Sequence, residues 1–119
     1  MLSAVLLALA SGIGALAAHA LKSRLSVDRY EVLQTAVHYQ FFHSLGLLGL
    51  GLLADRTPSA RLTAAGWLVF GGVTLFSGSL YALLAGAPHL VGVLTPLGGV
   101  ALIAGWCVCA LALLRERAR

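Results

Sequence analysis

Residues 2–21 read LSAVLLALASGIGALAAHAL and contain no charged side chain. This is the length of about 20 residues that an α-helix needs to cross the hydrocarbon core of a bilayer. Three further apolar stretches follow, at about residues 36–54, 62–85 and 90–114. Charged residues or the Gly86–Pro88 turn bound them. The sequence therefore predicts four transmembrane helices.

The composition supports the same class of protein. Of the 119 residues, 60% are hydrophobic and 10% are charged, against about 25% charged in ordinary soluble domains. The mean hydropathy is +0.95. A soluble globule of this size has too little interior to bury so much apolar surface. We therefore expect an all-α polytopic membrane protein, with residues 1–119 forming a single four-helix transmembrane domain.

The first apolar stretch could also be a cleaved leader, because Ala18-His19-Ala20 has the small-x-small form of a cleavage site. No basic residue precedes the apolar run, however, and secretory signals carry one there. We expect this segment to be a retained helix.

The net charge of +4 comes from basic residues between and after the apolar stretches. That placement is typical of residues that orient a membrane protein, and it argues against nucleic-acid binding. Five arginines fall on the side of the termini and three basic residues on the other: Arg56, Arg61, Arg115, Arg117 and Arg119 against Lys22, Arg24 and Arg29. The positive-inside rule then predicts that both termini are cytoplasmic.

Residues 22–35 form the long polar linker of the chain. Ser26 is a plausible N-cap with Asp28 in the first turn, and Val27, Tyr30 and Val37 recur at helical spacing. We expect an amphipathic segment that lies at the membrane interface and runs into the second span. The alternative is a disordered loop followed by a helix that begins near Val32.

The start of the fourth helix is open from sequence. Pro96 could kink a helix that begins near Leu90. It could instead be the first residue of a helix capped by Thr95.

Small residues recur four apart along three of the spans and would let helix backbones approach closely. Such faces predict a tight bundle or a homo-oligomer. Trp67 and Trp106 are expected near the cytoplasmic membrane surface, as interfacial belt residues. The small-residue stripes are Ala10, Gly14 and Ala18; Thr74, Gly78, Ala82 and Gly86; and Ala101, Gly105 and Cys109.

Polar residues inside the spans are the candidates for function. In an up-down bundle they all fall in the half opposite the termini. Tyr39 and His43 share a helix face, and His19 can reach them if the first two helices are antiparallel. We expect a polar pocket that opens to the extracytoplasmic face. Its candidate residues are His19, Tyr39, Gln40, His43, Ser77, Ser79, Tyr81 and Thr95.

The alternative is that the same side chains bond to one another and lock the fold. Metal binding is not expected, because His38 and His43 diverge on a helix and no HExxH or Cys/His cluster occurs. Cys107 and Cys109 diverge as well, and we expect both to be small buried residues. No carboxylate lies inside a span and no nucleophile motif is present, so we expect neither an enzyme nor a cofactor.

Several blocks of the chain together resemble the YgdD-like family of small membrane proteins, which has a eukaryotic transmembrane relative. The blocks are GALAAHAL at 14–21, TAVHYQFFH at 35–43, Gly66-Trp67, FSGSLY at 76–81, TPLGG at 95–99 and Gly105-Trp106. The chain departs from the pattern at Ala17, where the family suggests Gly. The resemblance implies a four-helix protein of the bacterial inner membrane with no established activity.

Two function classes follow from these patterns. The first is binding of a lipid or small amphiphile, such as a quinone, in the polar pocket. The second is a non-catalytic structural or assembly protein that stabilises the membrane or a partner complex. The expected partners are membrane lipids, a second copy of the chain, or another membrane protein.

Overall fold

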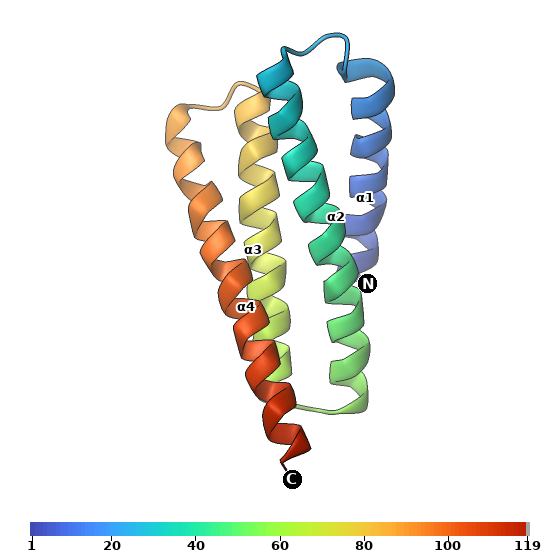
Figure 1. Ribbon diagram of the computed structural model, residues 1–119, viewed down its shortest axis with the longest axis vertical. Helices are drawn as coiled ribbons and strands as arrows, with labels where there is room; N and C mark the ends of the chain where they lie inside the picture. Colours follow the sequence, from blue (N-terminus) through green and yellow to red (C-terminus); the bar gives the residue numbers. More distant parts are fainter. Residues whose placement is uncertain (119) are drawn as a thin grey trace.

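The computed structural model describes residues 1–118 of the chain (Figure 1). Its elements are α1 (Leu2–Leu16), a π-helical turn (Ala17–Leu21), α2 (Val27–Arg56), α3 (Ala60–Leu84), a 3-10 helix (His89–Val93) and α4 (Leu94–Arg117). This part of the chain contains no strand, which confirms the predicted all-α class with four helices. Arg119, one of the arginines used for the orientation, lies outside the described residues.

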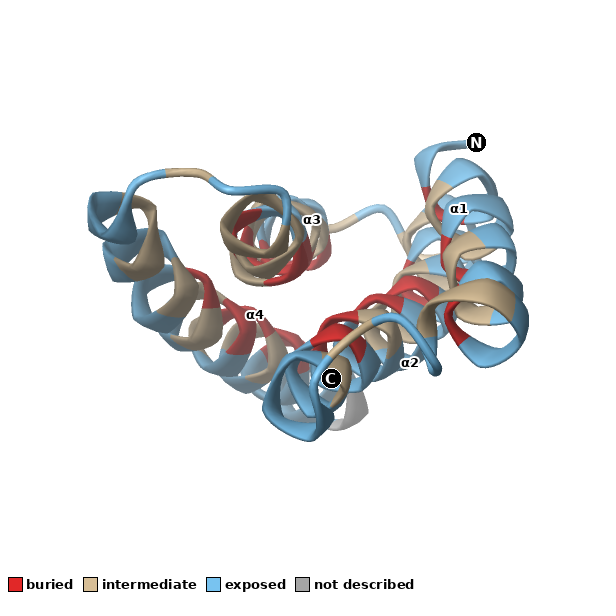
Figure 2. Cartoon of the chain, turned by 90° about the horizontal axis from the view of Figure 1, so that it is seen from above, coloured by how far each residue is buried: buried red, intermediate tan, exposed pale blue. Residues whose placement is uncertain are grey.

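The helices alternate up and down, and each packs on the next along the chain (Figure 1). The view down the bundle shows α1 and α3 on either side of α2, with α4 against α3 on the far side from α1 (Figure 2). α1 contacts α3 through Leu6, which packs against a core cluster formed by Val69, Val73 and Leu102. The molecule is therefore a flattened bundle, 55 × 28 × 19 Å.

Within residues 1–118, three helical stretches are long and apolar enough to cross a membrane: Leu2–Leu21, Ala60–Leu84 and His89–Glu116. These agree with three of the four predicted spans. α2 is 30 residues long, but His38, Tyr39, Gln40 and His43 make its middle less apolar than the other helices. A membrane crossing by α2 stays a prediction.

The linker is helical from Val27 onward and runs into the second predicted span, as expected, whereas its position at the membrane interface stays a prediction. α2 begins at Val27, and the side chain of its N-cap Ser26 accepts a hydrogen bond from the Arg29 backbone N–H at 3.4 Å. The segment continues straight into the rest of α2 (Figure 1). The reason is that no Gly or Pro interrupts residues 27–45, while Leu33 and Ala36 are buried and hold the first turns on the bundle.

The fourth helical segment begins at His89, next to Leu90, the first of the two proposed starts. A 3-10 helix, His89–Val93, leads directly into α4 at Leu94. Pro96 therefore lies in the first turn of α4, where a residue without an N–H is tolerated. Gly86 ends the preceding turn at φ +100°, a backbone conformation that glycine adopts readily.

The backbones of α3 and α4 approach each other closely. A Cβ built on Gly72 would lie 2.8 Å from the Leu102 backbone nitrogen, and one on Gly105 would lie 2.8 Å from Val69 Cγ2. The small-residue stripe of the fourth helix is thus used inside the bundle. In the stripe of the first helix, Ala10 is buried and a Cβ added at Gly14 would lie 3.3 Å from Val37 Cγ1 of α2, whereas Ala18 is exposed. In α3, by contrast, Thr74 and Gly78 are exposed.

Candidate functional site: two polar clusters and a lateral groove

Gln40 of α2 forms hydrogen bonds to both α1 and α3. Its side chain is 4% exposed. The Nε2 group donates to the Leu6 backbone oxygen of α1 at 2.8 Å, and Oε1 accepts from the Tyr81 hydroxyl of α3 at 2.6 Å. Because buried polar groups need partners in a membrane, these two bonds stabilise the position of α1 and α3 against α2.

Ser77 and Ser79 extend this network along α3. The Ser77 hydroxyl donates to the Ala36 backbone oxygen of α2 at 2.7 Å. Ser79 Oγ lies 2.9 Å from the Phe76 backbone oxygen and 2.5 Å from Thr95 Oγ1 of α4. Five of the predicted site residues, namely Gln40, Ser77, Ser79, Tyr81 and Thr95, therefore form bonds that join helices. We call Gln40, Ser77 and Tyr81 the Gln40 cluster.

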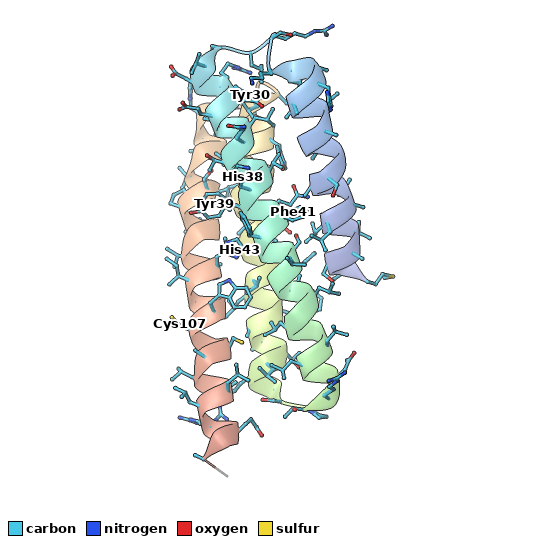
Figure 3. The ribbon with its side chains drawn as sticks, turned by 45° about the vertical axis from the view of Figure 1, so that its right-hand side comes forward. Tyr30, His38, Tyr39, Phe41, His43 and Cys107 are labelled. Carbon is cyan, nitrogen blue, oxygen red and sulfur yellow. The ribbon has the colours of Figure 1, made fainter. Side chains whose placement is uncertain are left out.

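A second cluster lies on the other side of α2, toward α4 (Figure 3). The Trp106 indole N–H of α4 donates to His43 Nδ1 at 3.0 Å. The Tyr39 ring stacks on the Phe76 ring with centroids 4.1 Å apart, and it lies 5.5 Å from the His43 ring. We call Tyr39, His43, Phe76 and Trp106 the His43 cluster.

His19 belongs to neither cluster, so the predicted His19–His43 contact is wrong. His19 is exposed in the π-helical turn after α1. The neighbouring Ala18 lines a small pocket together with Tyr30 and Gln34 of α2. Gln34 precedes His43 by nine residues, or about 14 Å of helix. His43 also faces α4 rather than α1, so both depth and direction separate the two imidazoles.

Trp106 is a site residue that the sequence analysis missed. It was expected in the interfacial belt, but it is half-buried and holds His43. Its ring lies over Gly46, where an added Cβ would be 2.6 Å from Trp106 Cη2. One signal was available in the sequence, because Trp106 precedes Arg115 by nine residues, or about 14 Å. With α4 crossing the bilayer, that distance would place the indole N–H below the membrane surface, where it needs a hydrogen-bond partner.

The cysteines and histidines form no metal centre in the part of the chain that the structure describes. Cys109 is buried as expected, but Cys107 is exposed on the outer surface of α4. Two residues apart on a helix, the thiols point in different directions.

A lateral groove runs between α1 and α3 beside the Gln40 cluster. It has a volume of about 180 Å³ and is lined by Leu6, Leu9, Ile13, Gln40, Val73, Thr74, Ser77, Gly78 and Tyr81. Gln40 on α2 contributes to its wall between the two flanking helices. A second groove of about 330 Å³ adjoins the start of α1, where Met1 to Ser3 face Gly66 and Trp67 of α3.

Comparisons with known proteins agree with the membrane class. Residues 13–99 match the family described as "Protein of unknown function (DUF423)". The chain is 42% identical to the UPF0382 membrane protein YwdK of Bacillus subtilis, over 94% of this chain and 92% of the relative. It is 43% identical to the UPF0382 membrane protein SERP0230 of Staphylococcus epidermidis, over 90% and 87%.

A more distant group of bacteria carries a similar protein. The chain is 40% identical to a UPF0382 membrane protein of Haemophilus influenzae, over 79% of this chain and 75% of the relative. No solved structure matches the chain. The resemblance to a small membrane-protein family of unknown function is thus confirmed, although these relatives carry the UPF0382 name rather than the YgdD name. The chain belongs to the DUF423 family, whose members in many bacteria are named UPF0382 membrane proteins.

Proposed function

We propose that all four helices cross the bacterial cell membrane, the inner membrane where there are two, with both termini in the cytoplasm. Support comes from the position of α2, which packs against both α1 and α3, two helices that are apolar enough to span. The long axis of 55 Å exceeds the hydrocarbon thickness of about 30 Å. The excess of arginines on the side of the termini supports the orientation.

The function that the geometry favours is non-catalytic binding of a lipid or small amphiphile in the lateral groove between α1 and α3. The observation that carries this proposal is the position of Gln40 and Tyr81 in the wall of an otherwise largely apolar groove. An apolar cleft with a few convergent polar groups is the usual form of a small-molecule site. A chain of the ligand would lie against Leu9, Ile13 and Val73.

The Gln40 cluster still has bonding capacity for such a ligand. Gln40 Nε2 carries two hydrogens, and the bond to the Leu6 oxygen uses one of them. The Tyr81 oxygen donates to Gln40 and can still accept. One free N–H and one free oxygen lone pair suit a hydroxyl or an ester carbonyl. Among the residues that the structure describes, no cationic side chain lines the groove, so a neutral polar group is favoured over a phosphate.

A matched pair of glycine variants tests this site. Nothing lies within 4 Å of a Cβ added at either Gly78 or Gly71 of α3. Gly78 lines the groove and Gly71 does not. Native mass spectrometry from gentle detergent, with lipid extraction in parallel, should show a specific co-purifying amphiphile in the parent and in Gly71→Leu. Gly78→Leu should lose it. Equal retention by the two variants would contradict a ligand in this groove.

The second candidate is a structural or assembly protein, and the closed bonding of Gln40, Ser77 and Ser79 favours it. In that case the same experiment gives a parent protein that carries bulk phospholipid alone. The exposed Thr74–Gly78 face of α3 would then be the surface for a second copy or another membrane protein. The native mass reports which of these assemblies forms.

A further inference from the structure

The hydrogen bond from Trp106 determines the tautomer of the His43 imidazole. A nitrogen that accepts a hydrogen bond carries a lone pair, so Nδ1 of His43 is unprotonated. The single ring hydrogen of the neutral imidazole is therefore on Nε2. No hydrogen bond from Nε2 occurs within residues 1–118. The ring thus presents one free N–H donor.

The His43 side chain that carries this donor is partly exposed. In the described part of the chain, Ser44 Oγ is the buried side-chain polar atom without a partner. His43 Nε2 is also without a hydrogen-bond partner among the described residues. His43 precedes Asp55 by twelve residues, or about 18 Å of helix. With α2 crossing the bilayer as proposed above, this donor lies near mid-depth, where water is absent and an unpaired N–H is costly.

Tyr39 supplies a second donor on the same face. Its side chain is 41% exposed, and its hydroxyl has no hydrogen-bond partner among the described residues. Its ring is held flat against Phe76, with an interplanar angle of 21°. Tyr39 and His43 are one helical turn apart and their rings are 5.5 Å apart. Two donors thus stand beside each other on a surface made of aromatic rings.

We infer that the His43 cluster is a binding site for a flat, apolar molecule with ring carbonyl oxygens, the chemistry of a quinone. The Tyr39 hydroxyl and His43 Nε2–H would donate to the carbonyl oxygens. The rings of Phe76 and Trp106 would pack against a planar ligand, as aromatic rings favour stacked or edge contacts. The neutral imidazole and the lack of charged residues in the cluster exclude an ionic ligand, because a buried charge needs a counter-charge.

This site is separate from the lateral groove, so it can be tested separately. Trp67 and Trp106 are the two tryptophans of the chain. In a Trp67→Phe background, all indole emission comes from Trp106 beside His43. A short-chain alkyl benzoquinone, titrated into the detergent-solubilised protein, should quench this emission saturably at one equivalent. Quenching that rises linearly without saturation would overturn the site.

A Tyr→Phe variant, which lacks the hydroxyl, tests whether Tyr39 donates a hydrogen bond to the quinone. Tyr39→Phe should weaken quinone binding by roughly five- to tenfold, the effect of one lost hydrogen bond of about 1 kcal/mol or slightly more. The thermal midpoint of the apo protein should not change, because that hydroxyl is unbonded. Tyr30→Phe removes the same group near the start of α2, outside both clusters, and should leave quinone affinity unchanged. Unchanged affinity in Tyr39→Phe would overturn the assignment.

A third arm separates a quinone from a lipid as the natural source of the carbonyl. A straight-chain ester with the same alkyl length carries a carbonyl but no ring. It should fail to displace the benzoquinone, whereas displacement at similar concentration would assign the site to a lipid ester instead. Gly78→Leu, which fills the lateral groove, should bind the quinone normally. The two proposals can therefore fail independently.

Discussion

Trp106 of α4 donates its indole N–H to Nδ1 of His43 of α2 over 3.0 Å. The bond joins two helices that are not neighbours in the chain, across the side of the bundle occupied by Tyr39 and Phe76. It also leaves the ring hydrogen of His43 on Nε2, which has no partner among the described residues. This one hydrogen bond thus stabilises the bundle and also makes His43 Nε2–H the free donor of the ring.

Trp106→Phe should destabilise the protein by roughly 1–2 kcal/mol, because it leaves His43 Nδ1 without a donor. Thermal unfolding in detergent, followed by circular dichroism, measures the change. Trp67→Phe is the matched control, since Trp67 is 62% exposed and its indole makes no hydrogen bond within the described residues. Equal midpoints for the two variants would show that the His43–Trp106 bond contributes nothing.

Gly98→Ala should separate α3 from α4. A Cβ at Gly98 would collide with the Phe76 backbone and would lie 2.8 Å from the Gly72 backbone oxygen. Overpacking of this kind costs roughly 1–3 kcal/mol. Gly99→Ala is the control, because its Cβ would meet Phe76 Cδ2 at an ordinary 3.8 Å. The thermal midpoint should fall in the first variant and stay near the parent value in the second; the reverse order would refute this packing.

The Tyr81–Gln40 bond is suited to a double-mutant cycle. Tyr81→Phe, Gln40→Leu and the double variant should give a coupling energy of about 0.6 kcal/mol, and at most about 1.7, as for other hydrogen bonds inside membranes. Stability is measured by unfolding in mixed micelles. Additive effects of the two single changes would mean that this bond contributes nothing to stability beyond the separate side chains.

The proposed topology predicts which loops a membrane-impermeant maleimide can label. In a Cys107→Ala, Cys109→Ala background, Ser23→Cys before α2 should react in intact cells. Ser59→Cys before α3 should react after permeabilisation alone. The opposite pattern would invert the orientation. Labelling of both in intact cells would mean that α2 does not cross the bilayer.

Much of the fold could be predicted from the sequence, because it depends on local properties of the chain. The uncharged run of Leu2–Leu21 and the mean hydropathy of +0.95 indicate membrane helices by length and composition. Ser26 correctly marked the start of α2, since N-capping is a property of a few adjacent residues. Gly86 and Pro88 marked the end of α3 for the same reason.

The sequence by itself determined the helices and the polar residues within them; the tertiary structure decided their partners. Helical spacing correctly placed Tyr39 and His43 together, but it does not say which neighbouring helix their shared face meets. That depends on how each helix is rotated about its axis, which the glycine contacts of α3 with α4 and the packing of Leu6 set through space. For this reason Gln40 pairs with Tyr81 and His43 pairs with Trp106, while His19 stays apart.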